Sequence, residues 1–441
     1  MEFIGAIGGT AWTVFFFIVA LSVIVFVHEY GHYIVGRWSG IHSEVFSVGF
    51  GPVLFSRTDR RGTKWQIAAI PFGGYVKFLG DADATSVQAG DVSGFSAAER
   101  RHTMTGAPLW ARASTVVAGP VANFILTFVL LAGLLVAIGI PRDVPTVGAL
   151  RDFPQAGPSL QVGDVILAIG GQETPDRESF GQVLDTLPAA KTVIYSVLRD
   201  GAEVMVTGPH PFAPVVGAVI VRSAAIDAGL QVGDVVLKAG GQDVLTFAQL
   251  PKIIAASKGA PVPLTIWRAG KTFDLTLTPR IRTVEDATGA MIERYQIGIG
   301  AGLFFEAAMR SPGPFETVTL TLERMWQMTV STFSGLWHIL IGAISTCNLS
   351  GAIGMAEAVG DAARTGAETF FGMMAVLSLG VGILNLFPIP VLDGGHLVFH
   401  AYEAVMRRPP SAGALRLLMS VGLSIVLGFM IYALSRDLVC V

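Results

Sequence analysis

The sequence is organised around V-H-E-Y-G-H, which occupies residues 27–32 at the end of an uncharged apolar run. Residues four positions apart lie on the same face of an α-helix, so His28 and His32 can bind one metal ion together. Glu29 lies beside them and has the chemistry of a general base for a metal-activated water. Ionisable groups are costly to bury in an apolar segment, and this cost favours a functional site over a chance match.

The composition is that of a membrane protein with a substantial polar portion. Of the 441 residues, 52% are hydrophobic and 14% are charged, whereas average soluble domains contain about 25% charged residues. The net charge of −3 predicts no nucleic-acid partner. The two cysteines, Cys347 and Cys440, lack C-x-x-C spacing and cannot form a zinc site by themselves.

Four apolar segments are long enough to cross a bilayer as helices. We predict these transmembrane helices within residues 1–38, 108–141, 370–396 and 413–436. Basic residues are frequent between the first two segments and between the last two, and positively charged loops remain in the cytosol. The first helix is therefore expected to begin outside and to end at the cytosolic side. The predicted fold class is an α-helical polytopic membrane protein with four transmembrane helices.

The polar loop at residues 39–107 contains a β-hairpin signal. Residues 52–57 and 64–70 have strand character and flank a turn at residues 58–63. Gly73 and Gly74 follow, and paired glycines in a strand indicate close approach of another backbone. An ordinary surface hairpin and a functional hairpin fit this pattern equally well.

A repeated polar region separates the second and third apolar segments. L-Q-V-G-D-V at residues 160–165 recurs at residues 230–235, and G-G-Q at residues 170–172 recurs at 240–242. Two copies predict two β-rich modules, at residues 143–210 and 211–281, rather than a solenoid. Residues 282–369 are expected to connect the second module to the third apolar segment. Residues 328–347 within this connection are too polar for a span, and we interpret them as an amphipathic interfacial helix.

A catalytic zinc ion takes three protein ligands and keeps one open position. The third apolar segment ends in N-L-F-P-I-P-V-L-D-G-G-H, residues 385–396. Asp393 is the only carboxylate of this stretch and is the first candidate for the third ligand. The prolines of this stretch are expected to break the helix just before it. His396 and His400 are the alternatives.

These motifs resemble those of the site-2 protease family of intramembrane zinc metalloproteases. The resemblance is greatest to the bacterial branch that cleaves anti-sigma factors of the sigma-E envelope stress response. It is carried by H-E-x-x-H at residues 28–32, A-G-P-V-A-N at residues 118–123 and N-x-x-P-x-P-x-L-D-G at residues 385–394. It covers nearly the whole chain. Two departures are Ala352, where the family leads us to expect proline, and residues 156–159, which differ from residues 227–230 and predict weaker peptide binding by the first module.

The resemblance implies a location in the bacterial inner membrane, with the active site towards the cytosol and the repeats as periplasmic PDZ domains. It also implies a membrane-associated cytosolic hairpin. The expected substrates are single-span membrane proteins, such as a pre-trimmed anti-sigma factor or signal-peptide remnants. The PDZ domains would bind a peptide or a periplasmic segment of the substrate. The implied site residues are the zinc ligands His28, His32 and Asp393, the catalytic base Glu29, and the substrate-binding residues Asn385, Pro390, Gly73, Gly74 and Asn123.

Two other classes of protein fit parts of the sequence. A membrane scaffold would use the repeated modules to bind protein tails and would carry a vestigial metal site. A zinc transporter would need polar groups along a pathway, and the other apolar segments are nearly free of ionisable residues. The complete set of two histidines and two carboxylates favours the protease.

Asn123 alone, in an apolar segment, is more typical of a hydrogen bond between helices.

Overall fold

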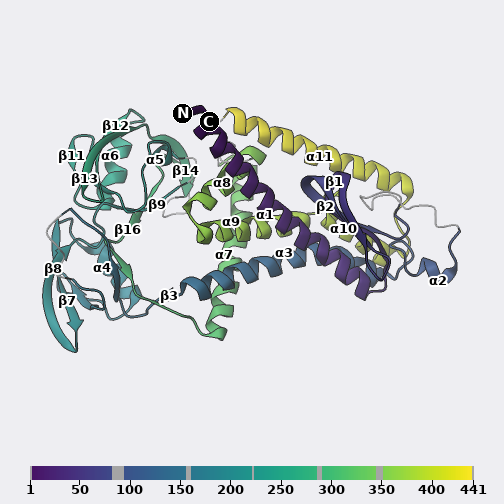
Figure 1. The fold of residues 1–441 in the computed structure, drawn as a ribbon, viewed down its shortest axis with the longest axis horizontal. Coiled ribbons are helices and arrows are strands. Elements are labelled where there is room, and N and C mark those ends of the chain that lie inside the picture. Colours follow the sequence, from purple (N-terminus) through teal and green to yellow (C-terminus); the bar gives the residue numbers. More distant parts are fainter. Residues whose placement is uncertain are drawn as a thin grey trace. The chain divides into compact units, whose positions relative to one another are not determined.

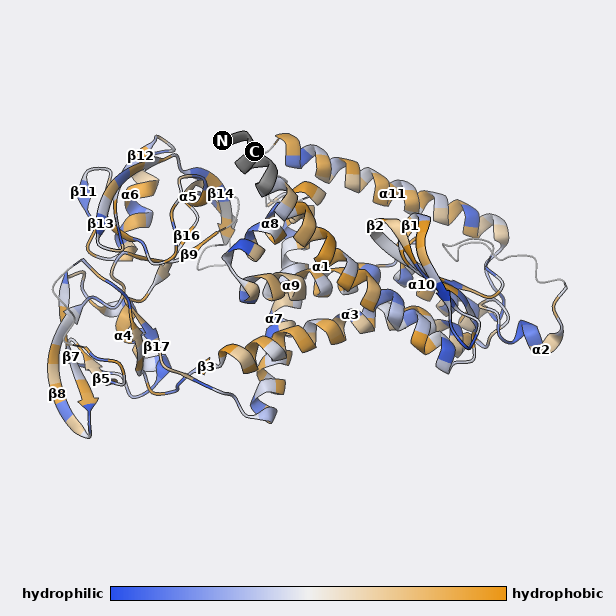
Figure 2. Cartoon of the chain, viewed as in Figure 1, coloured by the Kyte–Doolittle hydropathy of each residue, from blue (hydrophilic) through white to orange (hydrophobic). Residues whose placement is uncertain are grey.

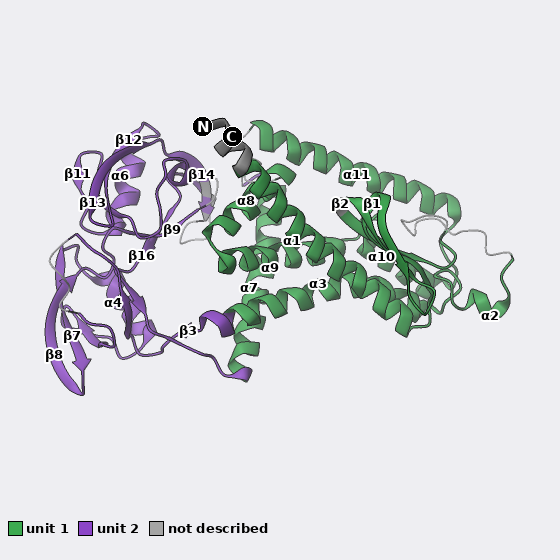
Figure 3. Cartoon of the chain, in the orientation of Figure 1, with its two compact units in different colours: residues 1–134, 315–341, 349–441 green, residues 135–314, 342–348 purple. Residues whose placement is uncertain are grey.

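The computed structural model describes residues 2–81, 94–154, 160–220, 223–285, 291–343 and 351–439. The chain forms two compact units (Figure 3), of which the first comprises residues 1–134, 315–341 and 349–441 and the second residues 135–314 and 342–348. Cys347, Cys440 and the divergent residues 156–159 lie outside the described residues.

The first unit contains the long apolar helices (Figures 1 and 2). Four helices are long and apolar enough to cross a membrane, which confirms the predicted number of candidate spans in the described part of the chain. The helices of this unit are α1 (Glu2–Trp38), the short α2 (Ala97–Arg100), α3 (Leu109–Ile138), α7 (Pro314–Leu340), α8 (Ala352–Thr365), α9 (Ala367–Asn385), α10 (Asp393–Met406) and α11 (Ala412–Val439). The candidate spans are α1, α3, α9 and α11.

Helix α7 is not one of the four candidate spans. It is also longer than the amphipathic helix predicted for residues 328–347, because it begins at Pro314. Its exposed apolar side chains recur every three or four residues, which gives the helix an apolar stripe. These side chains are Phe315, Val318, Leu322, Trp326, Val330, Phe333, Trp337 and Leu340.

The third transmembrane helix was predicted over residues 370–396, with a break at the prolines before Asp393. The structure confirms the break. Helix α9 ends at Asn385, and a separate helix, α10, begins at Asp393. Pro388 and Pro390 lie in the connection, where each removes a backbone donor and disfavours helical geometry in the residue before it. Asp393 is therefore the first residue of a new helix.

The start of α8 is capped by a residue distant in the sequence. Asp437 of α11 accepts backbone N–H bonds from Gly351 at 2.9 Å, Ile353 at 3.0 Å and Gly354 at 3.1 Å. A carboxylate satisfies the free N–H groups at a helix N-terminus. Ala352, where proline was expected, is the first residue of this capped helix.

Strands β1 (Ser43–Thr58) and β2 (Lys64–Phe78) form the sheet of the first unit. Thr58 pairs with Lys64 and Ser56 with Gln66, which confirms the predicted hairpin. Phe46 of β1 pairs with both Trp65 and Val76, so β1 lies between two halves of β2. The base of this sheet packs on the ends of α1 and α3 through a buried cluster of Tyr33, Ile41, Phe46, Val76, Phe78, Ala107 and Ala111.

The second unit consists mainly of strands, as expected for the repeats. Its elements are β3 (Ile140–Pro141), β4 (Val147–Leu150), β5 (Val165–Ile169), β6 (Gln172–Glu173), α4 (Arg177–Thr186), β7 (Thr192–Arg199), β8 (Ala202–Pro209), β9 (Val215–Val219), α5 (Ala224–Asp227), β10 (Val235–Ala239), β11 (Gln242–Asp243), the 3₁₀ turn Phe247–Gln249, α6 (Leu250–Ala256), β12 (Val262–Arg268), β13 (Lys271–Leu277), β14 (Arg280–Glu285), β15 (Met291–Gln296), β16 (Ile299–Gly302), β17 (Phe305–Ala307) and β18 (Met309–Arg310).

Both repeats contain the same ion pair between a partly exposed arginine and a buried aspartate. Arg199 donates two hydrogen bonds to Asp164, at 2.8 and 2.7 Å. Arg268 donates two to Asp234, at 2.6 and 2.7 Å. Each aspartate belongs to the repeated Gly-Asp, and each arginine precedes the turn at the end of its strand. The sequence repeat is therefore also a repeat of tertiary contacts.

The module boundary predicted at residue 281 is wrong, because later strands complete both modules. Strand β16 pairs with β9 of the second repeat. Strand β17 pairs with β4 of the first repeat, with Phe305 opposite Leu150. The second module is thus inserted into the first. The two share a hydrophobic cluster that includes Val147, Tyr195, Val215, Val235 and Phe304.

Candidate metal centre

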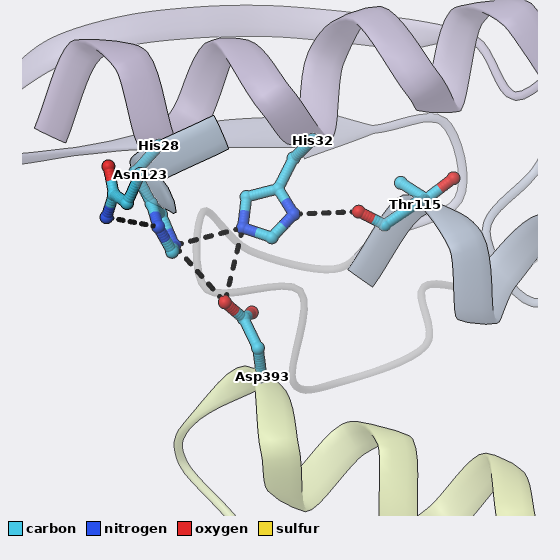
Figure 4. Close-up of polar contacts among 5 residues, drawn as sticks. All are labelled: His28, His32, Thr115, Asn123 and Asp393. Carbon is cyan, nitrogen blue, oxygen red and sulfur yellow. Dashed lines mark hydrogen bonds and ion pairs between the residues drawn. The ribbon is translucent and has the colours of Figure 1, made fainter. Parts of the chain in front are cut away.

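Three side chains from α1 and α10 converge on one point (Figure 4). The Nε2 atoms of His28 and His32 are 3.2 Å apart. The Oδ2 atom of Asp393 is 3.2 Å from the first of these nitrogens and 3.5 Å from the second. Helical spacing on α1 brings the histidines together, and the break between α9 and α10 presents the aspartate. The sequence predicted all three residues for a common site.

Helix α3 contacts the Nδ1 atom of each imidazole ring. The Nδ1 atom of His32 lies 2.8 Å from the backbone oxygen of Thr115, to which a ring N–H donates. The Nδ1 atom of His28 lies 3.2 Å from the side-chain amide of Asn123. Metal-binding histidines commonly hydrogen-bond through the second ring nitrogen in this way, which fixes the tautomer and orients the ring.

The amide of Asn123 is fully buried, and its oxygen has no hydrogen-bond partner. Turning the amide over would place this oxygen next to Nδ1 of His28, where it could accept the ring proton. The orientation of an asparagine amide is assigned from its hydrogen bonds. With the amide oxygen next to Nδ1, the ring proton lies on Nδ1, and Nε2 of His28 is unprotonated and able to bind a metal ion.

Gly119 allows α3 to approach the histidines closely. A Cβ atom at this position would lie 2.3 Å from Nε2 of His32 and 2.8 Å from Cε1 of His28. Neither ring can move away without losing its bond to α3. Glycine at position 119 is therefore a steric requirement of the site.

Glu29 faces the edge of the β1–β2 sheet. The backbone of Val76 lies beside its carboxylate. A Cβ atom at Gly74 would lie 3.3 Å from Cγ of Glu29, so glycine allows the strand to pass close to this side chain. The sheet edge, the carboxylate and the two histidines therefore belong to one site.

The remaining predicted residues lie around this centre with different contacts. Asn385 is the last residue of α9, and Pro390 packs near Gly422 of α11, where a Cβ atom would be 3.1 Å from the proline ring. Gly73 has a φ angle of +123° and lies against the ring of Phe50. Asn123 was predicted to bind substrate, but its contact here is with His28.

The alternatives for the third ligand do not join the donor cluster. Among the described residues, His28, His32 and Asp393 form the group that can hold a metal ion, and neither His396 nor His400 belongs to it. Burial lowers the pKa of His400 to about 4, with a smaller contribution from the charge of Arg112. His400 is therefore a neutral, partly buried side chain.

Sequence reasoning missed Thr115 and the role of Gly119. Thr115 contributes a backbone oxygen, which leaves no signature in the choice of side chain. The face of α3 offered a signal, because residues 115, 119 and 123 follow helical spacing and two of them belong to the conspicuous A-G-P-V-A-N stretch.

Comparison with known proteins places the chain in a family. The sequence profile of peptidase family M50 matches residues 16–429. A protein of Agrobacterium fabrum named as a zinc metalloprotease, Atu1380, is 35% identical over 427 residues, which cover 96% of this chain and 94% of that protein. The regulator of sigma-E protease RseP of Salmonella typhimurium is 34% identical over 91% of this chain and 92% of that protein.

Among solved structures, a PDZ domain of an SdrC-like protein from Listeria monocytogenes resembles part of the chain. The identity is 20%, the match covers 20% of this chain and 84% of that chain, and the TM-score is 0.16. The assignment to a family comes instead from the sequence matches, which extend over nearly the whole chain. The chain belongs to peptidase family M50, the site-2 proteases, and is a zinc metalloprotease of the type of the regulator of sigma-E protease.

Proposed function

We propose that His28, His32 and Asp393 bind the catalytic zinc ion of an intramembrane protease. The observation that carries this proposal is the spacing of their donor atoms, which is 3.2 to 3.5 Å. Donors bound to zinc at about 2.0–2.1 Å in a tetrahedron lie roughly 3.3 Å from one another. The Oδ2 atom of Asp393 is buried without a hydrogen-bond partner, as an atom available to a metal ion would be.

Glu29 is the general base of the proposed reaction. Bound zinc would supply a Lewis acid that polarises the scissile carbonyl and acidifies water. Glu29 takes the proton from the attacking water and delivers it to the leaving amine. Strand β2 passes close to this side chain at Gly74, and Glu29 itself is left free of the metal.

The second half of β2 receives the substrate as an added strand. A transmembrane helix hides its carbonyls in hydrogen bonds, so the segment to be cut must first unwind. Residues 74–77 of β2 pair with β1, and the same segment passes close to Glu29 at Gly74. Pairing with an exposed strand edge would extend the substrate next to the catalytic base. Gly73, Asn385 and Pro390 are proposed to contact the same segment.

The membrane orientation follows from chain order and charge. Basic residues lie in the segments that follow α1 and precede α11, so these segments are cytosolic and the N-terminus is periplasmic. The site then lies towards the cytosolic side of the inner membrane, because His28 and His32 are near the end of α1. The β-rich modules follow the second span and are periplasmic PDZ domains.

These modules select substrates in the proposed function. The second PDZ domain binds a peptide or a periplasmic segment of a single-span protein, and the tandem admits proteins whose outer domain has been removed. Support for this comes from the naming of relatives as regulators of sigma-E, which fits a pre-trimmed anti-sigma factor as substrate.

The test is cleavage of a single-span substrate by the purified protein in lipid vesicles. We expect cleavage by the wild type, its loss with a zinc chelator and its return when zinc is added. Glu29→Gln should retain zinc and lose cleavage by several orders of magnitude, because a neutral amide cannot accept the proton. A variant that cleaves at the wild-type rate would contradict the role of Glu29.

The same assay separates the protease from the other two classes. A scaffold would bind the substrate without cutting it. A transporter would move zinc across the vesicle membrane, and its transport would not depend on Glu29 as a base. Zinc uptake without cleavage would therefore exclude the proposed function.

A further inference from the structure

One face of α3 and one face of α10 each carry a row of residues that continues from the metal centre to an ion pair. On α3, Arg112 precedes Thr115, Gly119 and Asn123 by three, seven and eleven positions, so all four share one helix face. On α10, Asp393 and Glu403 are ten positions apart and share a face with His396 and His400. The first row supports the histidines, and the second begins with the third donor.

An ion pair joins the far ends of these rows. Nη1 of Arg112 donates to Oε2 of Glu403 at 2.9 Å, and Nη2 donates to Oε1 at 2.7 Å. The side chains are 13% and 20% exposed. Two parallel bonds to a planar guanidinium fix both distance and angle, which a single contact would not do.

Arg112 also forms a hydrogen bond near the start of its own helix. Its Nε atom donates at 3.0 Å to the backbone oxygen of Ala107, which precedes α3. This bond holds the guanidinium near the start of α3 while its other nitrogens bind Glu403. In turn, the guanidinium holds the pKa of Glu403 below its usual range, mainly through the hydrogen bonds it donates, so Glu403 remains charged at neutral pH.

We infer that the Arg112–Glu403 ion pair is a clamp that positions Asp393 against His28 and His32. The histidine donors on α1 are oriented by α3. Asp393 follows a non-helical connection, so the position of its carboxylate depends on how α10 lies against α3. Glu403 is about 15 Å along the axis from Asp393 at 1.5 Å per residue. Fixing α10 at this distance limits its rotation and its sliding, and both motions would displace Oδ2 of Asp393.

This inference rests on the proposed zinc site, and its test measures zinc affinity without any substrate. Arg112→Ala and Glu403→Gln should each weaken zinc binding by about 10- to 100-fold, the usual cost of losing a residue that orients a ligand. Arg112→Lys keeps the charge and loses the two-bond geometry, so we expect an intermediate loss. The purified full-length protein is titrated against a chelator of known affinity.

A double mutant separates a clamp from two independent effects. If the two residues act through their mutual contact, Arg112→Ala/Glu403→Gln should bind zinc no more weakly than the weaker single variant. Cobalt(II) in place of zinc adds a spectroscopic readout, because its visible absorption changes with coordination geometry. The variants should show an altered cobalt spectrum, which a loss of stability alone would not produce.

Arg199→Ala is the matched control, since it breaks a comparable two-bond ion pair with Asp164 in the other unit. It should leave zinc affinity unchanged. The clamp would be overturned if both single variants had wild-type zinc affinity and a wild-type cobalt spectrum. It would also be overturned if the fold-losses in zinc affinity of the two single variants multiplied in the double mutant. If Arg112→Ala does not fold, Arg112→Lys and Glu403→Gln decide by the same criteria. Absence of zinc binding in the wild type would overturn the proposed function, and the clamp with it.

Discussion

The Nδ1 atom of His32 lies 2.8 Å from the backbone oxygen of Thr115. A backbone oxygen that accepts the ring proton leaves Nε2 with its lone pair directed at His28 and Asp393. Helix α3 therefore sets the chemical state of a ligand that belongs to α1. The site depends on how closely these two helices pack, and the following predictions test this packing, the ligand set, the modules and the topology.

The first prediction concerns Gly119. Gly119→Ala should weaken zinc binding at least tenfold, because the new Cβ atom would lie 2.3 Å from Nε2 of His32 and would displace an oriented ligand. Gly133→Ala on the same helix is the control, since no heavy atom lies within 4 Å of its Cβ position. Equal zinc affinity in the two variants, measured by chelator competition, would show that α3 has room to adjust.

The second prediction concerns the choice of ligand on α10. Asp393→Asn should lose most zinc binding, since a neutral amide replaces an anionic oxygen ligand. His396→Ala should retain zinc, because its ring is not part of the donor cluster. Metal content of the two purified variants decides this, and the reverse result would transfer the ligand role to His396.

The third prediction concerns the β-rich modules. The ends of the second unit are brought together where Pro141 pairs with Met309. Replacing residues 142–308 with a short linker should therefore leave the first unit intact, whereas ending the deletion at residue 281 would leave β16 and β17 without partners. The shortened protein should still cleave and should accept substrates with untrimmed outer domains. A variant that folds and binds zinc but cleaves nothing would make the modules part of the catalytic machinery.

The fourth prediction is that α7 does not cross the membrane. If α7 crossed, the direction of α9 would reverse, and Asp393 would lie most of a roughly 30 Å hydrocarbon core away from the two histidines. Single cysteines at Ser334 and Thr365, with Cys347 and Cys440 replaced by serine, should react with a membrane-impermeant reagent from the periplasm. Labelling of Thr365→Cys from the cytosol alone would rule out the four-span topology.

Local sequence patterns were enough to predict the histidine pair, the candidate spans and the hairpin of this protein. Helical spacing on α1 was enough to place His28 and His32 together, because an α-helix fixes which residues share a face. Hydropathy and length predicted the four candidate spans, since a membrane span needs about 20 apolar residues. The turn at residues 58–63 predicted the hairpin, because turn chemistry is also local.

Tertiary structure decided the contacts between residues distant in the sequence. The backbone oxygen of Thr115 has no side-chain signature, and the need for glycine at position 119 exists only once α3 packs on α1. The pairing of β17 with β4 joins strands separated by the whole second module. Repeats in the sequence mark equivalent segments, but they do not say which strand closes which sheet. The contact of Arg112 with Glu403 likewise spans 291 positions, and its geometry comes from helix packing, which no local pattern encodes.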